Sequence, residues 1–493
     1  MLSRFLPTIV ACLATFVAAP SMAAEPPPNI VLIVADDMGY ADPTCFGLAG
    51  EERTYQTAQL DKLASEGTRF TNFYVSQAVC TASRSSFLTG CYANRVGLQG
   101  ALNHTSKNGL NPSETTLAEL CKARGYATGC YGKWHLGMGS LGAVHHGFDE
   151  FFGLPYSNDN GPFHPTIKNM PPLPLIEGER VIATDPDQSQ FTRQFTDRAI
   201  GFIKKNKEKP FFLYLPHVMP HVPIFASDRF KGKSGGGLYT DVLLELDAGI
   251  GEVLATLKEQ GLEENTLVIF FSDNGPFLSY GSHAGNARPY REGKLTAFEG
   301  GVRTPCILRW PGKIPAGRVC EDMLSAMDLV PTIATLLDQP LPSVKIDGKN
   351  ILPVLTNQPG AKSPHEALFI YSGTELHAVV SGPWKLHFPH PYLTVAAEPG
   401  RNGKPSNWAN LKPDSITKSG VEGIASRHGY RVEKLPLSLY NLSEDPGEVK
   451  NVAEQNPEVV ARLSALAETM RADLGDSLQG RTGTGVRPAG KVE

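Results

Sequence analysis

The chain has 493 residues, of which 41% are hydrophobic and 19% are charged. This composition is that of a globular protein, and the length allows one large core and a second domain. The formal net charge of −4 excludes a generally basic surface, so we expect no nucleic acid partner.

The N-terminal residues predict a signal peptide. Arg4 supplies a positive charge, residues 5–19 are mostly apolar, and small residues precede a cleavage point near Ala24. The apolar stretch is short and contains Pro7, which disfavours a retained membrane span. We therefore expect residues 1–23 to be removed and the mature protein to be exported, periplasmic or secreted, with no stable membrane span.

Buried strands alternate with helical patterns in the first two thirds of the chain. Continuous apolar runs at 29–35, 211–215 and 267–271 are typical of strands buried on both faces of a parallel sheet. Helical patterns lie between them, at 116–124 and 242–261. This alternation predicts an α/β domain with a mostly parallel central sheet flanked by helices.

The pattern changes after about residue 353. Short alternating segments at 378–382 and 384–388 predict a small antiparallel sheet, and residues 457–474 predict a closing helix. The polar stretch at 398–426 predicts a loop, and the residues after the helix have few anchors. The sequence thus predicts four parts: a signal peptide (1–23), a catalytic domain (24–355), a C-terminal α+β subdomain (356–478) and a flexible tail (479–493).

Two polar clusters end predicted strands. Asp36 and Asp37 follow the first strand, and Asp273 and Asn274 follow the strand at 267–271. Open α/β sheets bind ligands at such strand ends, and two adjacent carboxylates favour a neutralising cation. Oxygen ligands without nitrogen or sulfur suit calcium or magnesium better than zinc. For an isolated Asp-Asp pair, a solvated turn is the alternative.

Two further segments carry groups suited to an anionic substrate. Lys133 and His135 follow a predicted strand at 126–131, and residues two apart on an extended segment project to the same side. A lysine and a titratable histidine on one face can bind an anion and move a proton. His221 lies in a proline-rich loop after the strand at 211–215, where the prolines stiffen the backbone. Each of these side chains alone would more often be packed or solvated.

The run from Cys80 to Gly90 is the most informative segment. Cys80 enters a predicted helix four residues before Arg84, and the helix N-terminus and the guanidinium both favour negative charge at the thiol. The bare spacing also fits a buried cysteine beside an exposed arginine. The full run, CTASRSSFLTG, resembles the sulfatase family. In that family the cysteine is oxidised to formylglycine, whose hydrated aldehyde is the nucleophile.

The resemblance covers nearly the whole mature chain. It includes GKWHLG at 132–137, Lys294 with FEGGVRTP at 298–305, and LYNLSEDPGE at 439–448. LPYSND at 154–159 resembles the arylsulfatase A branch. The resemblance implies an alkaline phosphatase-like fold, with a large α/β domain and a small C-terminal domain.

The resemblance also implies a metal and a modified residue. Four oxygen donors would bind one calcium ion together with the formylglycine made from Cys80: Asp36, Asp37, Asp273 and Asn274. A formylglycine-generating maturation enzyme is therefore an implied partner. The usual modification motif has proline where this chain has Ala82.

Six further positions match side chains that act on the sulfate in the family. Arg84 and Lys133 would hold the hydrate, and His135 would deprotonate its second hydroxyl. The resemblance also implies four substrate contacts. Lys133 and Lys294 would contact the substrate, with Lys294 binding its sulfate. His221 would protonate the leaving alcohol oxygen, and Ser157 would approach the substrate.

The predicted activity is hydrolysis of sulfate monoesters, either aryl sulfates or sulfated sugars and glycans. One alternative is a phosphate or phosphonate ester hydrolase of the same superfamily. The zinc-dependent phosphatases of this fold use two zinc ions and a Ser or Thr nucleophile, and their extra ligands are not evident here. The other alternative is a non-catalytic protein that binds sulfated glycans if Cys80 stays unmodified.

Two loops are expected to border the pocket because segments at strand ends carry specificity. They span 157–179 and 398–430, and residues that could touch a sugar or a second anionic group are Phe163, His164, Arg401, Trp408 and Arg427.

The eight cysteines also allow disulfides in an exported protein. The possible pairs are Cys306–Cys320 and Cys121–Cys130.

Overall fold

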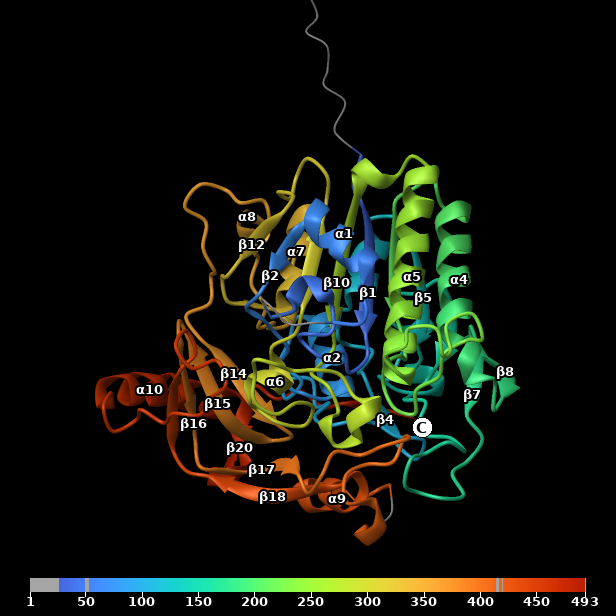
Figure 1. The fold of residues 1–493 in the computed structure, drawn as a ribbon. Helices are drawn as coiled ribbons and strands as arrows, with labels where there is room; N and C mark the ends of the chain where they lie inside the picture. Colours follow the sequence, from blue (N-terminus) through green and yellow to red (C-terminus); the bar gives the residue numbers. More distant parts are fainter. Residues whose placement is uncertain (1–25, 49–52, 414–415, 419, 493) are drawn as a thin grey trace, which may run out of the picture.

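A computed structural model describes residues 26–48, 53–413, 416–418 and 420–492. The predicted signal peptide therefore lies outside the described residues. The chain forms a large domain around a ten-stranded sheet and a smaller C-terminal domain (Figure 1). None of the described helices is both long and apolar enough to span a membrane.

The large sheet is mixed, with a parallel centre and antiparallel pairings toward both edges. Its strand order is β12-β2-β11-β10-β1-β9-β5-β6-β7-β8. The five central strands, β10 to β6, run parallel. The strands are β1 (Asn29–Ala35), β2 (Thr68–Phe70), β5 (Ala127–Lys133), β6 (Glu150–Leu154), β7 (Pro174–Glu177), β8 (Arg180–Thr184), β9 (Phe211–Pro216), β10 (Thr266–Ser272), β11 (Cys306–Arg309) and β12 (Arg318–Cys320).

Helices cover both faces of this sheet, which explains its continuous apolar strands. Alternate residues of β1 enter different cores: Ile30 and Leu32 pack on one side, and Val31 and Ile33 on the other. The first core includes residues of α2 (Cys80–Thr89), α3 (Leu117–Ala123) and α7 (Leu329–Leu336). The second includes residues of α1 (Ala58–Glu66), α4 (Phe191–Lys205) and α5 (Leu238–Glu259). In Figure 1, α4 and α5 lie side by side.

The C-terminal domain has the small antiparallel sheet that the sequence predicts, in the order β14-β15-β16-β19. The closing helix α10 (Pro457–Leu474) packs its apolar face on this sheet. The strands of this domain are β14 (Leu368–Ser372), β15 (Glu375–Ser381), β16 (Trp384–His387), β19 (Ser438–Asn441), and the separate pair β17 (His390–Val395) and β18 (Tyr430–Leu435).

Short elements complete the fold. They are β3 (Phe73–Tyr74) with β13 (Leu324–Ser325), α6 (Glu299–Val302), α8 (Leu352–Leu355), β20 (Gly475–Asp476) with β21 (Arg481–Thr482), and β4 (Asn108–Gly109) with β22 (Gly490–Lys491).

Two predictions about the C-terminal third differ from the structure. The stretch predicted as a loop contains the start of α9 (Gly420–His428), whose Val421, Ile424 and Ala425 pack against the large domain. The residues after Gly480 do have anchors, because β22 pairs with β4 and the Arg487 Nε lies 2.6 Å from Glu114 Oε1. Both differences depend on partners far away in sequence, which local composition does not reveal.

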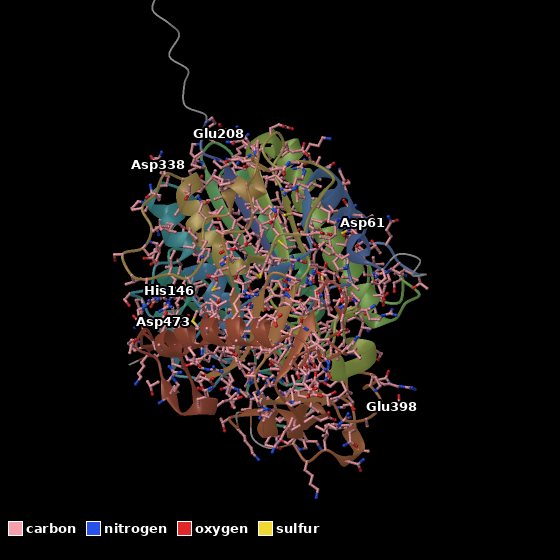
Figure 2. The ribbon with its side chains drawn as sticks, turned by 90° about the vertical axis from the view of Figure 1, so that its left-hand side faces the viewer. Asp61, His146, Glu208, Asp338, Glu398 and Asp473 are labelled. Atoms are coloured by element: carbon pink, nitrogen blue, oxygen red, sulfur yellow. The ribbon has the colours of Figure 1, made fainter. Side chains whose placement is uncertain are left out.

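Ion pairs also connect the two domains. Asp473 of α10, labelled in Figure 2, accepts from Arg95 Nη2 at 2.6 Å and from Lys345 Nζ at 2.5 Å. Arg95 is buried and also pairs with Asp347 at 2.6 Å. The C-terminal helix is therefore fixed to the segment that follows α2, the helix that begins with Cys80.

All seven described cysteines are free thiols. Cys306 is in β11 and Cys320 is in β12, and β2 lies between these two strands. Both cysteines are paired in register with Phe70 of β2. Two strand spacings therefore separate them, which exceeds the reach of a disulfide without backbone movement. Cys121 and Cys130 are both buried in the first core.

Candidate active site

Four adjacent parallel strands end at the same edge of the sheet, and each is followed by polar residues. β1 leads into Asp36 and Asp37, and β10 leads into Asp273. β5 ends at Lys133, and β9 leads into the loop that holds His221. This edge is where open α/β sheets bind ligands, so the fold brings the predicted residues together.

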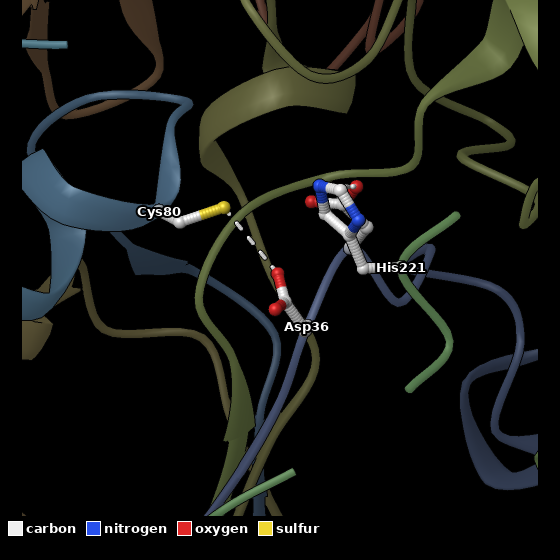
Figure 3. Close-up of side chains that lie close together, drawn as sticks. Asp36, Cys80 and His221 are labelled. Atoms are coloured by element: carbon white, nitrogen blue, oxygen red, sulfur yellow. Dashed lines mark hydrogen bonds and ion pairs between the residues drawn. The ribbon is translucent and has the colours of Figure 1, made fainter. Parts of the chain in front are cut away.

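Cys80 lies at the centre of this group, at the first residue of α2. Its Sγ is 3.3 Å from Asp36 Oδ1 and 3.3 Å from Lys294 Nζ. Figure 3 shows the thiol directed toward Asp36, with the His221 ring near the same carboxylate group. Four potential ligand atoms lie within 4.8 Å of one another, from Asp36, Asp37, Cys80 and His221.

Three cations balance the three carboxylates of the centre. Lys133 Nζ lies 2.5 Å from Asp36 Oδ2, and Lys294 Nζ lies 2.6 Å from Asp37 Oδ1. Arg84 donates to Asp273 Oδ2 from Nη2 at 2.8 Å and from Nε at 3.0 Å. Every one of these side chains is buried, so charges that would otherwise be very unfavourable are paired.

The pKa values of the carboxyls reflect this pairing. Burial alone would raise the pKa of Asp36, but Lys133, His221, Arg84 and Lys294 together hold it well below its ordinary value. Burial and the neighbouring Asp36 raise the pKa of Asp273 to about 6, against the opposing effect of Arg84. Of these two carboxyls, Asp36 therefore carries its charge more firmly.

The residues also fit a bound metal ion. Asn274 donates through Nδ2 to Asp37 Oδ1 at 2.7 Å, while its Oδ1 is buried without a partner in the described residues. A buried amide oxygen with unused bonding capacity is costly unless a donor or cation meets it. With the carboxylates of Asp36, Asp37 and Asp273, it makes an all-oxygen donor set of the kind that hard divalent cations take.

The thiol is not activated in the way that the sequence suggests. Burial, with a further contribution from Asp36, raises the pKa of Cys80 well above its ordinary value. Arg84 donates to Asp273 and to the Lys133 carbonyl oxygen rather than to the sulfur. The helix N-terminus and the spacing to Arg84 are therefore outweighed by desolvation, and the structure holds a protonated thiol at position 80.

The two site histidines have defined orientations. His135 Nε2 lies 2.7 Å from the Leu102 carbonyl oxygen, which can only accept, so this nitrogen carries the proton. The other ring nitrogen, His135 Nδ1, therefore carries a lone pair, which is buried and has no hydrogen-bond partner in the described residues. His221 Nδ1 likewise lies 2.5 Å from the Val222 carbonyl oxygen, which leaves Nε2 at 3.6 Å from Asp37 Oδ2.

Burial dominates the protonation of both rings. It lowers the pKa of His135 well below its ordinary value, with Lys133 adding to the effect. It also lowers the pKa of His221, with Lys294 adding to it. Ser157 Oγ approaches His221 Nδ1 at 3.4 Å, so the least specific of the predicted residues also reaches the centre.

Backbone conformations in the left-handed region cluster at this site. Asp37 has φ 63°, His135 has φ 58° and Leu295, next to Lys294, has φ 73°. Such conformations are uncommon for residues other than glycine and are maintained by surrounding contacts. Gly132, at φ 140°, allows a close approach, since a Cβ there would lie 1.9 Å from the Pro216 carbonyl oxygen.

Comparison with known proteins decides the family. Residues 28–339 match the sulfatase family, and residues 363–486 match the C-terminal region of aryl-sulfatase. The chain belongs to the sulfatase family. It is 38% identical over 484 residues to human arylsulfatase A, a match that covers 92% of this chain and 90% of that protein.

Other relatives of this sulfatase act on different sulfate esters. Dog N-acetylgalactosamine-6-sulfatase is 35% identical over 444 residues, covering 86% of this chain and 81% of that protein. The crystal structure of the PsFucS1 sulfatase from Pseudoalteromonas sp. superposes with a TM-score of 0.75 at 26% identity and covers 90% of each chain. The predicted fold, a large α/β domain with a small antiparallel C-terminal domain, is thereby confirmed.

The protein is therefore a sulfuric ester hydrolase. The family match favours this reading over a phosphate ester hydrolase and over a protein that only binds glycans. Family membership also implies a formylglycine and a metal ion, and the buried cluster of carboxylates, cysteine and histidine is the place where both fit.

The structure adds residues that the sequence did not single out. Asp159 and Phe277 lie near His221, and His428 lies against Phe277, from three different segments of the chain. Asp159 belongs to the LPYSND segment, which was the only available signal. His428 lies in a stretch that reads as a loop, and no sequence pattern connects it to the site.

Proposed function

We propose that this sulfatase hydrolyses sulfate monoesters through a formylglycine made from Cys80, with one calcium ion beside it. The observation that carries the proposal is the position of Cys80 Sγ, 3.3 Å from both Asp36 Oδ1 and Lys294 Nζ. A nucleophile placed there has a metal-binding carboxylate on one side and a sulfate-binding cation on the other.

The calcium ion would be held by Asp36, Asp37, Asp273 and Asn274. The unpartnered Asn274 Oδ1 and the absence of nitrogen and sulfur in this set support a hard oxygen-loving cation. When both groups are bound, the formylglycine hydrate supplies the attacking hydroxyl and the calcium ion polarises the sulfate.

The basic side chains would orient and stabilise the reacting groups. Lys294 would bind the sulfate oxygens, while Lys133 and Arg84 would hold the hydrate. In the structure Lys133 and Lys294 are paired with Asp36 and Asp37. A divalent cation that neutralises these carboxylates would leave both ammonium groups available to an anionic substrate.

The two histidines would move protons in opposite directions. His221 would protonate the leaving alcohol oxygen from Nε2, the nitrogen on the side of Asp37, and this step requires the doubly protonated ring because Nδ1 donates to the Val222 carbonyl oxygen. His135 would remove the proton of the second hydroxyl, so that the aldehyde re-forms and sulfate leaves. Its free Nδ1 supports the role of a base, and burial keeps this ring neutral by lowering its pKa.

Maturation and export complete the proposal. A formylglycine-generating enzyme would act on the unfolded CTASR segment, because Cys80 is only 2% exposed after folding. Cleavage near Ala24 would deliver the enzyme outside the cytoplasm, where sulfated sugars or aryl sulfates would be its substrates.

The test is a Cys80→Ala variant assayed on 4-nitrophenyl sulfate, with Cys121→Ala as the control for loss of another buried free cysteine. We expect turnover only in the wild type and the control. Mass analysis of the Cys80 peptide should show a loss of about 18 Da relative to cysteine and no reaction with an alkylating reagent. Full activity in Cys80→Ala, or an unmodified cysteine in active enzyme, would contradict the proposal.

A further inference from the structure

Beyond His221, away from the sheet, a row of side chains leads from the catalytic centre into the C-terminal domain. The Phe277 ring lies 6.3 Å from the His221 ring and 5.0 Å from Lys294 Nζ. The His428 ring follows at 5.0 Å from Phe277, and the His164 ring at 6.1 Å from His428. Because Phe277 lies against both His221 and Lys294, this row is next to the place where Lys294 would hold a sulfate ester.

His164 presents an unused hydrogen-bond donor in this row. Its Nδ1 accepts from the backbone amides of Ile167 at 2.9 Å and Thr166 at 3.2 Å, so the neutral ring carries its proton on Nε2. His164 is only 7% exposed, and its Nε2 has no partner within the described residues. A buried donor of this kind indicates a ligand that accepts a hydrogen bond.

Asp159 presents an unused acceptor beside it. Asn160 donates to its Oδ1 at 2.9 Å, and no basic side chain among the described residues lies within ion-pair distance of its carboxylate. The ordinary pKa of an Asp carboxyl is about 3.9, so the group carries a negative charge at neutral pH next to a centre that binds anions.

His428 is held in place as the third polar group. Its Nδ1 lies 2.7 Å from the Tyr280 hydroxyl, and its ring lies against Phe277. Its Nε2 makes no hydrogen bond to the described part of the chain. Since α9 carries His428, the C-terminal domain contributes directly to the surroundings of the substrate.

We propose that Asp159, His164 and His428 form a hydroxyl-binding subsite for the organic part of the substrate. This inference rests on the proposed function, because it needs the sulfate to be held at Lys294. The subsite selects a sugar that carries one sulfate and free hydroxyl groups beside it.

The chemistry of the three groups explains this selection. A sugar hydroxyl can donate to the Asp159 carboxylate and accept from His164 Nε2 at the same time. A plain aryl group offers neither partner, so the buried His164 Nε2 stays without a hydrogen bond and the half-buried Asp159 gains none. A second sulfate at this place would meet the negative charge of Asp159, so disulfated sugars are disfavoured.

The test compares Asp159→Ala with wild type on two kinds of substrate, a panel of galactose 3-, 4- and 6-sulfates and 4-nitrophenyl sulfate. We expect kcat/KM for the best galactose sulfate to fall roughly 10- to 100-fold, and to fall at least tenfold more than kcat/KM for the aryl sulfate. Asp228→Ala, which removes an exposed carboxylate outside the subsite, should leave both values unchanged. An equal fall on both substrates, or no fall on the sugar, would overturn the subsite.

A binding measurement separates this inference from the proposed mechanism. In the non-reactive Cys80→Ala background, loaded with calcium, the Kd for the preferred galactose sulfate should rise roughly tenfold or more when Asp159→Ala is added. The same change should weaken binding of galactose 2,6-disulfate less than binding of the monosulfate. If wild type turns over neither 4-nitrophenyl sulfate nor any of the galactose sulfates, the proposed function is wrong. If it turns over at least one of them but Asp159→Ala leaves the Kd unchanged, only the subsite is wrong.

Discussion

Two of the buried clusters of charged side chains among the described residues of this sulfatase differ in how their bonding capacity is used. One is the catalytic centre around Cys80. The other, the junction cluster, consists of Glu299, Lys385, His387 and Glu448, where β16 meets α6. Lys385 Nζ lies 2.8 Å from Glu299 Oε1 and 3.1 Å from Glu448 Oε1, and His387 Nε2 lies 2.8 Å from Glu448 Oε1.

The comparison shows that burial of charge does not by itself mark an active site. In the junction cluster the charged groups pair with one another, two from β16, one from α6 and one from Glu448, which lies outside the regular elements at φ 51°. In the catalytic centre Asn274 Oδ1 and His135 Nδ1 remain unpartnered, and Asp37 and His135 adopt left-handed backbone conformations. The junction has one unpartnered atom of its own, His387 Nδ1, but burial lowers the pKa of that ring and keeps it neutral. The unpartnered amide oxygen of Asn274 beside three carboxylates distinguishes the site, because the junction cluster has no such oxygen among the described residues.

The same substitution in the two clusters should have opposite consequences. Lys294→Met removes a cation that acts on the sulfate, so kcat/KM on 4-nitrophenyl sulfate should fall roughly 10²–10³-fold. Lys385→Met removes the ammonium group that two buried carboxylates share and leaves Glu299 with Arg303 and Glu448 with a neutral histidine, so the free energy of unfolding should fall by about 3–5 kcal/mol. Urea unfolding and kinetics of both variants check this. A large stability loss in Lys294→Met with normal kinetics would break the comparison.

Metal binding should stabilise only the catalytic centre. After chelation we expect activity to be lost and to return with CaCl₂ but not with ZnCl₂. Calcium at 100 times its Kd should add about 2.7 kcal/mol to the unfolding free energy. Asn274→Ala should lose most of this gain, while the exposed Asn402→Ala should keep it. Equal calcium stabilisation of both variants would refute Asn274 as a ligand.

Acid should weaken the C-terminal domain through two stacked histidines beside the junction cluster. The His377 and His390 rings lie 3.8 Å apart, and burial lowers the pKa of each to about 3. Because the unfolded chain takes up these protons near pH 6.5, stability is complete above that pH and declines as the pH falls toward about 3. Each histidine contributes a slope of about 1.4 kcal/mol per pH unit in this window.

Thermal unfolding between pH 7 and pH 4 checks this expectation. His377→Gln removes one of the two titrating groups and should flatten the pH dependence of Tm. The surface variant His145→Gln should leave the pH dependence as in the wild type. An unchanged slope in His377→Gln would show that the stack is not the source of acid sensitivity.

The smallest expected effect concerns the residue that departs from the family motif. The Ala82 amide donates to the Gly100 carbonyl oxygen at 3.2 Å, and proline has no such donor. Ala82 lies in the first turn of α2, where proline is otherwise tolerated. Ala82→Pro should therefore lower the unfolding free energy by about 1 kcal/mol, as measured by urea titration, while formylglycine still forms.

Much of this protein could be determined from the sequence alone. Continuous apolar runs predict β1, β9 and β10, because strands covered by helices on both faces need no polar alternation. The CTASR run and the polar residues after each strand predict the chemistry, because parallel strands that end at one edge bring their following residues together.

Only the tertiary structure decided the rest. It showed that desolvation raises the pKa of Cys80 although the local sequence favours a thiolate. It brought Asp159, His164 and His428 close together from two domains. It also showed the junction cluster and the anchored C-terminus. The reason is physical: burial, unpartnered atoms and long-range ion pairs depend on residues far apart in the chain, whereas periodicity and motifs record local order.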